Sequence, residues 1–299
     1  MKPGIYLVHK RVGETSFSLV RSFMDEVVAA GIRRKRLPVC HGGALDPFAE
    51  GLVLLLAGQA TRLMDRLHAV PKAYLAEIAW GSETDNGDPL GRVVAQGDAS
   101  ALGAGRIEAA LREFLGWREQ VPPAFSNKRV GGERAYLKAH RGEQFELPAS
   151  RVYLHQADFL RHDLPRSSTL RLVSGGGYYV RALARDLGRV TGARAHLAAL
   201  RRTDIGPWHD PGPGRREAVA GAGLFPWLPA RELTAGELQR LRESGPIEEG
   251  TIQPPPWPLP DGFPDPAPRI RGMHAGGLAA LLRAGQGRLL ADPMLGEPI

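Results

Sequence analysis

The sequence predicts a mixed α+β protein, because compact apolar runs alternate with segments whose apolar residues recur at the helical spacing. The compact runs, typical of strands, are residues 4–10, 52–57, 72–80 and 168–173. The segments with helical spacing are residues 16–30, 59–68, 98–118 and 179–188. With 299 residues, 43% of them hydrophobic, the chain can form one large domain or two unequal ones around a packed core.

The chain is basic, and most of its basic residues are arginines. Its formal net charge is +7, with 39 Lys and Arg against 32 Asp and Glu, and its pI is about 9.8. The planar guanidinium of Arg suits phosphate groups and base edges, so the composition favours RNA or DNA as a partner. A solvated Arg-rich surface would have the same composition, and this alternative stays open.

A single cysteine, Cys40, excludes an internal disulfide and a zinc site built on cysteines. Cys40 precedes His41, but neighbours in an extended chain point to opposite faces, so the two do not form a catalytic dyad. We expect Cys40 to be a small buried residue. No run approaches the ~20 apolar residues that span a bilayer, and Ile5–Val8 is too short for a signal peptide. We therefore expect a soluble cytoplasmic protein.

The N-terminal strand 4–10 precedes a helix that Thr15 or Ser16 caps and Gly31 ends. The side chains expected to face the core are those of Phe17, Val20, Met24, Val27 and Val28. A basic cluster, Arg33–Arg36, follows this helix. Such a run either contacts phosphate groups or is a solvated charged turn.

The rest of the chain contains two further predicted helices, a turn, a capping box and a loop. The helix 98–118 is expected to turn Ile107, Leu111, Phe114 and Leu115 inward; the helix 179–188 has Val180, Leu183, Ala184 and Leu187 on one face and Arg181 and Arg185 on another. Asp85 and Asp88, close to Gly81 and Gly91, predict a turn between strands rather than a metal site. Thr234 and Glu237 form a capping box, and the Pro-rich residues 254–268 predict a loop.

The segment His41–Gly51 holds the most informative pattern in the chain. Its carboxylate, Asp46, lies between Gly42-Gly43 and Pro47, and a buried strand, 52–57, follows at once. Glycine permits unusual backbone angles and proline restricts its own, so Asp46 is expected on a rigid loop anchored by the core. From these residues alone, Asp46 is equally well a catalytic acid or a turn residue.

The pattern His-x-Gly-x-Leu-Asp-Pro-x-Ala-x-Gly resembles the catalytic motif of the TruB family of tRNA pseudouridine synthases. Three further blocks resemble that family in the same order: Lys72–Tyr74, Pro122–Tyr136 and Tyr179–Gly188. Together the blocks span most of residues 1–230. The resemblance implies that Asp46 is the indispensable catalytic residue and that no cofactor or metal is needed. Cys40, Gly42 and Ala44 depart from the family pattern, which has Gly at the first position and Thr at the other two.

The resemblance also implies roles for other residues. Tyr74 would stack on the target uracil and assist proton removal, and Arg181 would pair with Asp46 and lower the pKa of that carboxyl group. His41 would hold flipped nucleotides or a phosphate, and Leu200 would line the base pocket. The remaining candidates for RNA contact are Arg33, Arg34, Lys35, Arg36, Lys72, Lys128, Arg134, Tyr136, Tyr179, Arg201 and Arg202. Each of these, taken alone, could also be an ordinary core or surface residue.

The family resemblance implies two domains. Residues 1–230 would form a catalytic domain with a central, mostly antiparallel sheet flanked by helices and loops, and an insertion at about 122–150 would clasp the RNA. Residues 231–299 would form a small PUA-like RNA-binding β domain. The expected substrate is a uridine of the tRNA T-loop, position 55. The expected protein is a monomer without an obligate protein partner or a membrane association.

Three alternatives stay open from the sequence. One is a non-catalytic RNA-binding or tRNA-folding protein that keeps this fold. Another is a guide-dependent pseudouridine synthase acting on ribosomal RNA. The third is a glycosidase with a pair of carboxylates, for which Glu50 is the acid nearest to Asp46 in sequence.

Overall fold

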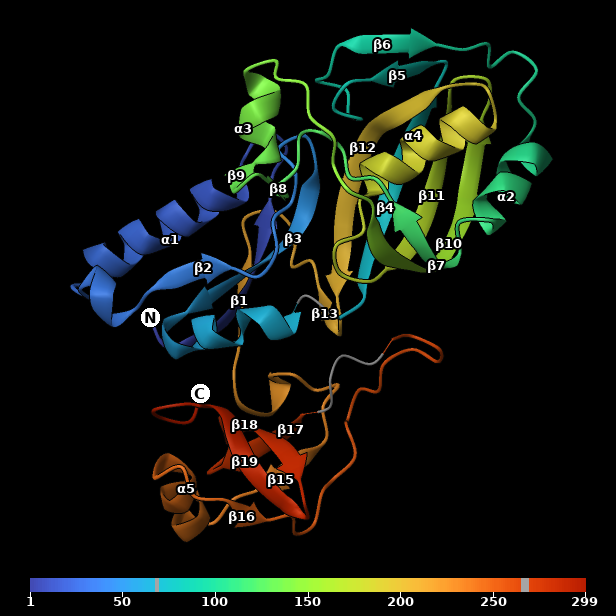
Figure 1. Ribbon diagram of the computed structural model, residues 1–299. Coiled ribbons are helices and arrows are strands. Elements are labelled where there is room, and N and C mark those ends of the chain that lie inside the picture. The colour runs from blue at the N-terminus through green and yellow to red at the C-terminus, as the bar shows by residue number, and fades with distance from the viewer. Residues whose placement is uncertain (68–69, 265–268) are drawn as a thin grey trace. The chain divides into compact units, whose positions relative to one another are not determined.

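The computed structural model describes residues 1–67, 70–264 and 269–299, which form two compact units (Figure 1). Unit 1 consists of Met1–Pro47, Gly51–Val70 and Asp204–Ile299; unit 2 consists of Phe48–Glu50 and Pro71–Thr203. His68, at the end of the helix expected over 59–68, and residues 265–268 of the Pro-rich stretch lie outside the described residues. Among the described residues, no helix has the length and apolar character needed to cross a membrane.

The N-terminal part of unit 1 is a small antiparallel sheet with one long helix. Strand β1 (Gly4–Lys10) pairs with β14 (Arg216–Val219) on one side and β3 (Glu50–Ala57) on the other. β3 also pairs with β2 (Val39–His41), and β13 (Trp208–His209) pairs with the last residues of β12 (Ala195–Ile205). The expected strands 4–10 and 52–57 are thus confirmed. The other elements here are α1 (Ser16–Ala29) and the 3₁₀ segments η1 (Arg34–Arg36), η2 (Gly58–Leu67) and η3 (Gly221–Gly223).

Helix α1 begins as predicted at the cap Thr15, but its buried face differs from the expected one. The buried residues are Ser16, Val20, Phe23 and Val27, whereas the Phe17 side chain is 61% exposed and Val28 is also exposed. The expected face was therefore wrong at these two positions. The cause is a polar contact, because Ser16 bonds to the backbone of Leu45 and thereby turns its own side of the helix inward.

The C-terminal part of unit 1 is a five-stranded sheet. Its order is β15 (Ala230–Glu232), β17 (Ile270–His274), β18 (Gly277–Gly285), β19 (Arg288–Met294) and β16 (Ile247–Glu248). The Thr234–Glu237 capping box opens α5 (Ala235–Arg242), as the sequence predicts. Leu278 and Leu281 of β18 belong to the same hydrophobic cluster as Leu54 and Leu56 of β3. The PUA-like type of this segment, and a domain boundary at residue 230, stay predictions.

Unit 2 is built on the strand order β12-β4-β11-β10-β7. The strands are β4 (Lys72–Trp80), β11 (Ser167–Ser174), β10 (Ser150–Asp163) and β7 (Gly116–Gln120), and the pairings β4–β11, β11–β10 and β10–β7 are antiparallel. Helices α2 (Ala104–Arg112) and α4 (Val180–Val190) lie against this sheet (Figure 1). The mixed α+β class with a mostly antiparallel sheet is confirmed.

The smaller elements of unit 2 are two hairpins and a short helix. β5 (Ser82–Thr84) pairs with β6 (Val93–Gln96), and β8 (Arg129–Val130) pairs with β9 (Glu133–Arg134) before α3 (Ala135–His140). The turn expected around Asp85 and Asp88 therefore lies between β5 and β6. The Asp88 carboxylate accepts the Leu90 amide hydrogen at 2.8 Å, so its role in the turn is confirmed.

The helix expected over residues 98–118 is shorter in the structure. It ends at Arg112, and residues 116–118 lie in strand β7, so the expectation was wrong there. Gly116 has φ +83°, a left-handed conformation that stops a helix, and β7 gains a full set of partners in β10. Ile107, Leu111 and Phe114 are buried as expected, whereas Leu115, beyond the helix, is exposed.

Candidate active site

The loop that carries Asp46 leaves β2 through a glycine that lies close against leucine side chains. The Gly42 amide donates to the carbonyl of Leu54 at 2.8 Å. A Cβ atom on Gly42 would lie 2.9 Å from Leu67 Cδ1 and 3.0 Å from Leu56 Cδ1. Gly43 follows with φ +131°. The Gly-Gly pair therefore lets the backbone lie directly on the leucine core of unit 1.

Both neighbours of Asp46 are held by the turn between β1 and α1. The Leu45 amide donates to Ser16 Oγ at 2.9 Å, and the Pro47 carbonyl accepts from the Gly13 amide at 2.8 Å. The same carbonyl lies 3.3 Å from Lys10 Nζ. Asp46 itself is half-buried. The backbone at Asp46 is therefore held in place from both sides.

Lys10 organises this turn. Its side chain is 0% exposed, and besides Pro47 its ammonium group donates to the carbonyls of Arg11 at 2.9 Å and Glu14 at 2.8 Å. A buried ammonium needs such acceptors to offset the loss of water. Lys10 and Ser16 are functional supports that the sequence reasoning missed. The available signal was an isolated lysine at the end of a strand, in a chain that has few lysines.

His41 and Cys40 contact different groups, as expected for adjacent strand residues. His41 Nδ1 accepts from the Gly43 amide at 3.4 Å. The Cys40 sulfur lies 3.9 Å from the sulfur of Met64, and burial raises the pKa of the Cys40 thiol. Cys40 is half-buried against the hydrophobic cluster rather than fully buried. These contacts give Cys40 a packing role.

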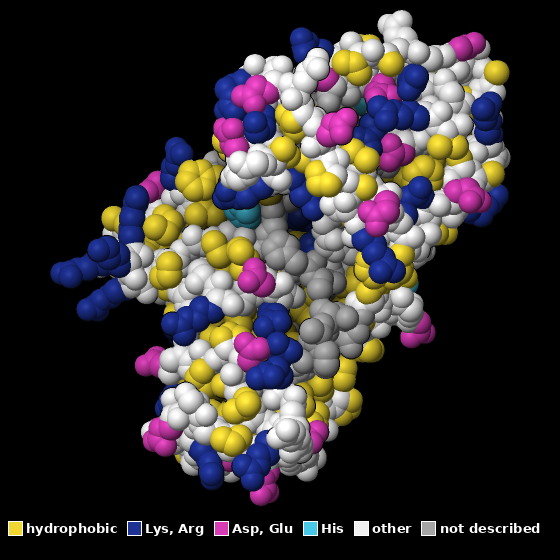
Figure 2. Space-filling model, viewed as in Figure 1, with side chains coloured by type: hydrophobic (Ala, Val, Ile, Leu, Met, Phe, Trp, Pro, Cys, Tyr) yellow, Lys and Arg dark blue, Asp and Glu magenta, His cyan; other side chains and the backbone are white. Residues whose placement is uncertain are grey.

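The basic cluster Arg33–Arg36 is exposed throughout and lies on η1 between α1 and β2. Arg34 forms an exposed ion pair with Asp25 at 3.1 Å. Figure 2 shows Lys and Arg side chains in several groups on the face in view, with Asp and Glu side chains among them. The cluster is thus accessible to a polyanion, while its contact with RNA stays a prediction.

In unit 2, Tyr74 and Lys72 lie on β4 and are both buried. Burial, together with the positive charge of Arg202, lowers the pKa of Lys72 to about 7. Arg202, on the neighbouring strand β12, is only 2% exposed. Two buried basic side chains, on neighbouring strands, therefore interact with one another in unit 2.

Arg181 is the second residue of α4 and is 3% exposed. Its Nη1 donates to the Asn86 carbonyl at 2.7 Å and its Nη2 to the Phe125 carbonyl at 2.9 Å. These carbonyls come from the turn after β5 and from the start of the expected insertion. Two acceptors on different segments fix the plane of the guanidinium. No sequence signal pointed to these carbonyls, because any residue type could supply them.

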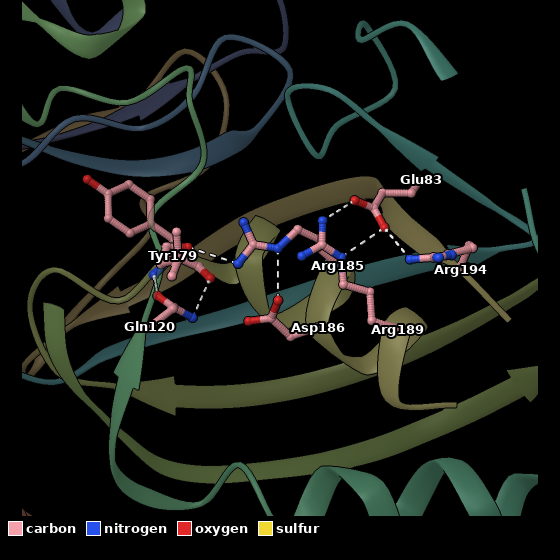
Figure 3. A network of polar contacts seen from close by, with 8 residues as sticks. Glu83, Gln120, Tyr179, Arg185, Asp186, Arg189 and Arg194 are labelled. Atoms are coloured by element: carbon pink, nitrogen blue, oxygen red, sulfur yellow. Dashed lines mark hydrogen bonds and ion pairs between the residues drawn. The ribbon is translucent and has the colours of Figure 1, made fainter. Parts of the chain in front are cut away.

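A polar network surrounds α4 (Figure 3). Glu83 on β5 accepts from Arg189 at 2.5 Å and from Arg194 at 3.2 Å. Burial alone would raise the pKa of Glu83, but the hydrogen bond and charge of Arg189 and the charge of Arg194 outweigh it and lower that pKa. Arg185 donates from Nε to Asp186 at 2.8 Å. α4 is therefore tied to β5 through a charged contact on its outer side.

The remaining candidates lie on several elements of unit 2. Lys128 donates to Ser150 Oγ at 2.9 Å, and Arg134 is exposed at the start of α3. The Tyr136 ring meets His140 edge-on, with centroids 6.3 Å apart. Tyr179 is the N-cap residue of α4. Leu200 is buried and Arg201 half-buried on β12. Their roles in binding stay predictions.

The described residues contain no group of three His, Cys, Asp or Glu side chains that could hold a metal ion. Asp85 forms hydrogen bonds with the backbone and side chain of Arg92 at 3.0 and 3.1 Å. This contact gives Asp85 a role in the turn, as expected from the sequence.

Comparison with solved structures shows that the fold is a known one. A chain of a Cbf5-Nop10-Gar1 complex matches 98% of this chain with a TM-score of 0.65 and 18% identity, over 84% of its own length. A chain of an H/ACA RNP bound to a substrate RNA containing 2′-deoxyuridine matches 97% of this chain and 79% of its own, with a TM-score of 0.62 and 17% identity. At these identities the likeness concerns the fold alone.

Comparison with sequences defines the class and then the family. Residues 33–180 match the model of the TruB family pseudouridylate synthase (N terminal domain), which places the chain among the pseudouridylate synthases. A tRNA pseudouridine synthase B of Thermobifida fusca is 35% identical over 256 residues, which cover 81% of this chain and 85% of that relative. The chain belongs to the TruB family.

Two further relatives carry the same name. The one from Symbiobacterium thermophilum is 38% identical over 81% of this chain and 79% of its own length. The one from Xanthomonas campestris is 42% identical over 171 residues, which are 57% of this chain. In that comparison the chain spans about half (55%) of the relative's length.

Proposed function

We propose that this protein is a tRNA pseudouridine synthase that isomerises a uridine of the T-loop, position 55, with Asp46 as the catalytic carboxylate. The observation that carries the proposal is that the family's motif aspartate lies on a loop whose backbone is fixed on both sides by hydrogen bonds to the β1–α1 turn. Its relatives named tRNA pseudouridine synthase B support the same substrate.

The reaction breaks the bond between uracil N1 and ribose C1′ and forms a bond between C5 and C1′. The proton of C5 leaves, and N1 gains a proton, so no redox step or added atom is needed. The uridine must leave its stack before protein groups can reach it. Ionised Asp46 then either attacks the nucleotide as a nucleophile or acts as the base that starts cleavage. Both roles use a charged carboxylate with a fixed direction.

The family resemblance assigns roles in the proposed reaction to two residues of unit 2. By the family resemblance, Arg181 is the expected partner of the Asp46 carboxylate and would set its orientation. Tyr74 stacks on the extruded uracil and assists removal of the C5 proton. Support comes from the burial of both side chains and from the two carbonyls that hold the Arg181 guanidinium.

Binding would rest on phosphate contacts that position the T-arm without reading its sequence. The exposed cluster Arg33–Arg36 and the exposed Arg134 supply positive charge for this purpose. The proposed enzyme works in the cytoplasm as a monomer, without a protein partner, guide RNA or cofactor.

The test is incubation of the purified protein with a T-arm transcript, followed by chemical mapping of pseudouridine. The expected result is pseudouridine at the T-loop uridine with no other component added. Absence of product would contradict the proposal. Product formed only with an added guide RNA would identify a guide-dependent enzyme, and release of free uracil would identify a glycosidase.

A further inference from the structure

The end of β7 is fastened to the start of α4 by a buried amide. Gln120, the last residue of β7, is 3% exposed. Its Nε2 donates to the Tyr179 carbonyl at 3.1 Å, and its Oε1 accepts from the Tyr179 amide at 2.9 Å. Tyr179 is the N-cap residue of α4 and lacks a side-chain cap of its own. Figure 3 shows the two bonds between Gln120 and Tyr179. Gln120 therefore fixes the backbone two residues before Arg181.

Two further hydrogen bonds join the next residues to the same helix. The Val121 carbonyl accepts from Arg185 Nη2 at 2.9 Å. The Phe125 carbonyl accepts from Arg181 Nη2, also at 2.9 Å. Between them lie Pro122 and Pro123, both buried and both restricted in φ. Residues 120–125 and the first turns of α4 are thus held together at three points.

These hydrogen bonds join two segments that the proposed function uses. Residues 120–125 are where the expected RNA-clasping insertion leaves the sheet, and α4 is the helix that carries Arg181. A buried amide bonded in both directions to one residue, with an arginine on the following carbonyl, leaves little freedom between the two. The root of the insertion therefore has a fixed position relative to Arg181, and so has any RNA that the insertion binds.

We propose that Gln120 and Arg185 are positioning residues, which lock the root of the insertion to α4 so that RNA binding and the placement of Arg181 are coupled. This inference rests on the proposed function. It concerns residues that touch neither the uridine nor Asp46, and it predicts an effect on the reacting step rather than on affinity alone.

The helix supplies a matched control. Arg189, one turn beyond Arg185, binds Glu83 on β5. Arg189→Lys should therefore perturb a charged contact of α4 without loosening residues 120–125. Arg185→Lys keeps the charge of Arg185 but lacks the guanidinium that reaches Asp186 and Val121 together. Gln120→Met removes both bonds to Tyr179 at similar size. Gln120→Glu keeps the size but places a charged acceptor oxygen against the Tyr179 carbonyl.

The first measurement is amide hydrogen exchange in the free protein, which does not depend on any activity. The amides of Ser126, Ala135 and Tyr136 report on the insertion, because each is hydrogen-bonded to a carbonyl within it, at 3.0, 2.8 and 3.1 Å respectively. In Gln120→Met and Arg185→Lys these amides should exchange about tenfold faster, while Arg189→Lys should leave them as in the wild type. Unchanged exchange in both variants would overturn the proposal.

The second measurement is the single-turnover rate at saturating T-arm RNA, with the dissociation constant determined in parallel. We expect Gln120→Met, Gln120→Glu and Arg185→Lys to slow the reacting step about tenfold to a hundredfold, with a smaller change in affinity, because misplacement affects orientation most. Faster exchange combined with a wild-type rate would reduce both residues to a structural role and overturn the proposal. Inactive wild-type protein would instead refute the proposed function, while the exchange results would still decide whether the insertion is held.

Discussion

At the scale of single residues, the candidate site depends on side chains that do no chemistry. Lys10 is fully buried and donates to three carbonyls around the turn that also holds Pro47. Ser16 reaches Leu45 on the other side of Asp46. The candidate catalytic residue, Asp46, is named from the sequence because it lies in a motif. The roles of Lys10 and Ser16 were missed, since the carbonyls and the amide that they contact have no residue-type signature.

Replacing Lys10 tests this support. Lys10→Met keeps the length of the buried side chain but leaves the part-buried carbonyls of Arg11 and Glu14 without this donor, which costs about 1–3 kcal/mol of stability. The free energy of unfolding, measured in urea, should fall by that amount, and the single-turnover rate should fall with it. Lys2→Met, at an exposed position, is the control. Equal stability and rate in both variants would contradict the assigned role.

At the scale of elements, the ends of some helices and strands follow from the local sequence, and the ends of others depend on tertiary contacts. The predicted runs 4–10 and 72–80 match β1 and β4, and the capping box at Thr234 opens α5. The strand β10 had no assignment from the sequence. Its buried Val152 and Leu154 alternate with polar residues, and two irregularities in its pairing with β11 shift that alternation. The helix expected over residues 98–118 was too long, because the residues from Gly116 onward pair with β10 as strand β7.

The contact of Glu83 on β5 with Arg189 on α4 and with Arg194 can be tested by mutation. Glu83→Gln removes a buried carboxylate from two arginines and should cost about 1–3 kcal/mol at pH 7. Because the pKa of Glu83 is lowered in the folded protein, its stabilising effect is present above the ordinary pKa of Glu and is lost as the pH falls through the lowered value. The stability difference between wild type and Glu83→Gln should therefore shrink on acidification. A difference that is constant from pH 7 to acid would contradict this assignment.

At the scale of the whole molecule, family membership and positive charge point to the same kind of partner. The net charge of +7 is spread over the chain, and the exposed cluster Arg33–Arg36 is one accessible part of it. The resemblance names Asp46, Tyr74 and Arg181 as a set, and their joint role stays a prediction. It could not predict the Asn86 and Phe125 carbonyls that hold Arg181, because any residue type can supply a backbone carbonyl.

Salt dependence tests the role of the basic cluster. If Arg36 neutralises an RNA phosphate, Arg36→Ala should weaken binding and reduce the slope of log K against log salt by about 1. The measurement is a salt titration of T-arm binding. Arg166→Ala, an exposed arginine next to Asp163 on the β10–β11 turn, serves as the comparison. The same slope in wild type and Arg36→Ala would place that side chain outside the RNA contact.

One pair of measurements tests the catalytic role of the Asp46 carboxylate most directly. Asp46→Asn keeps the shape of the side chain and removes its charge. The dissociation constant for a T-arm transcript should stay close to that of the wild type, because phosphate contacts dominate affinity. In single-turnover reactions the variant should form no pseudouridine above background. Pseudouridine formation by Asp46→Asn at a rate comparable to the wild type would contradict the account.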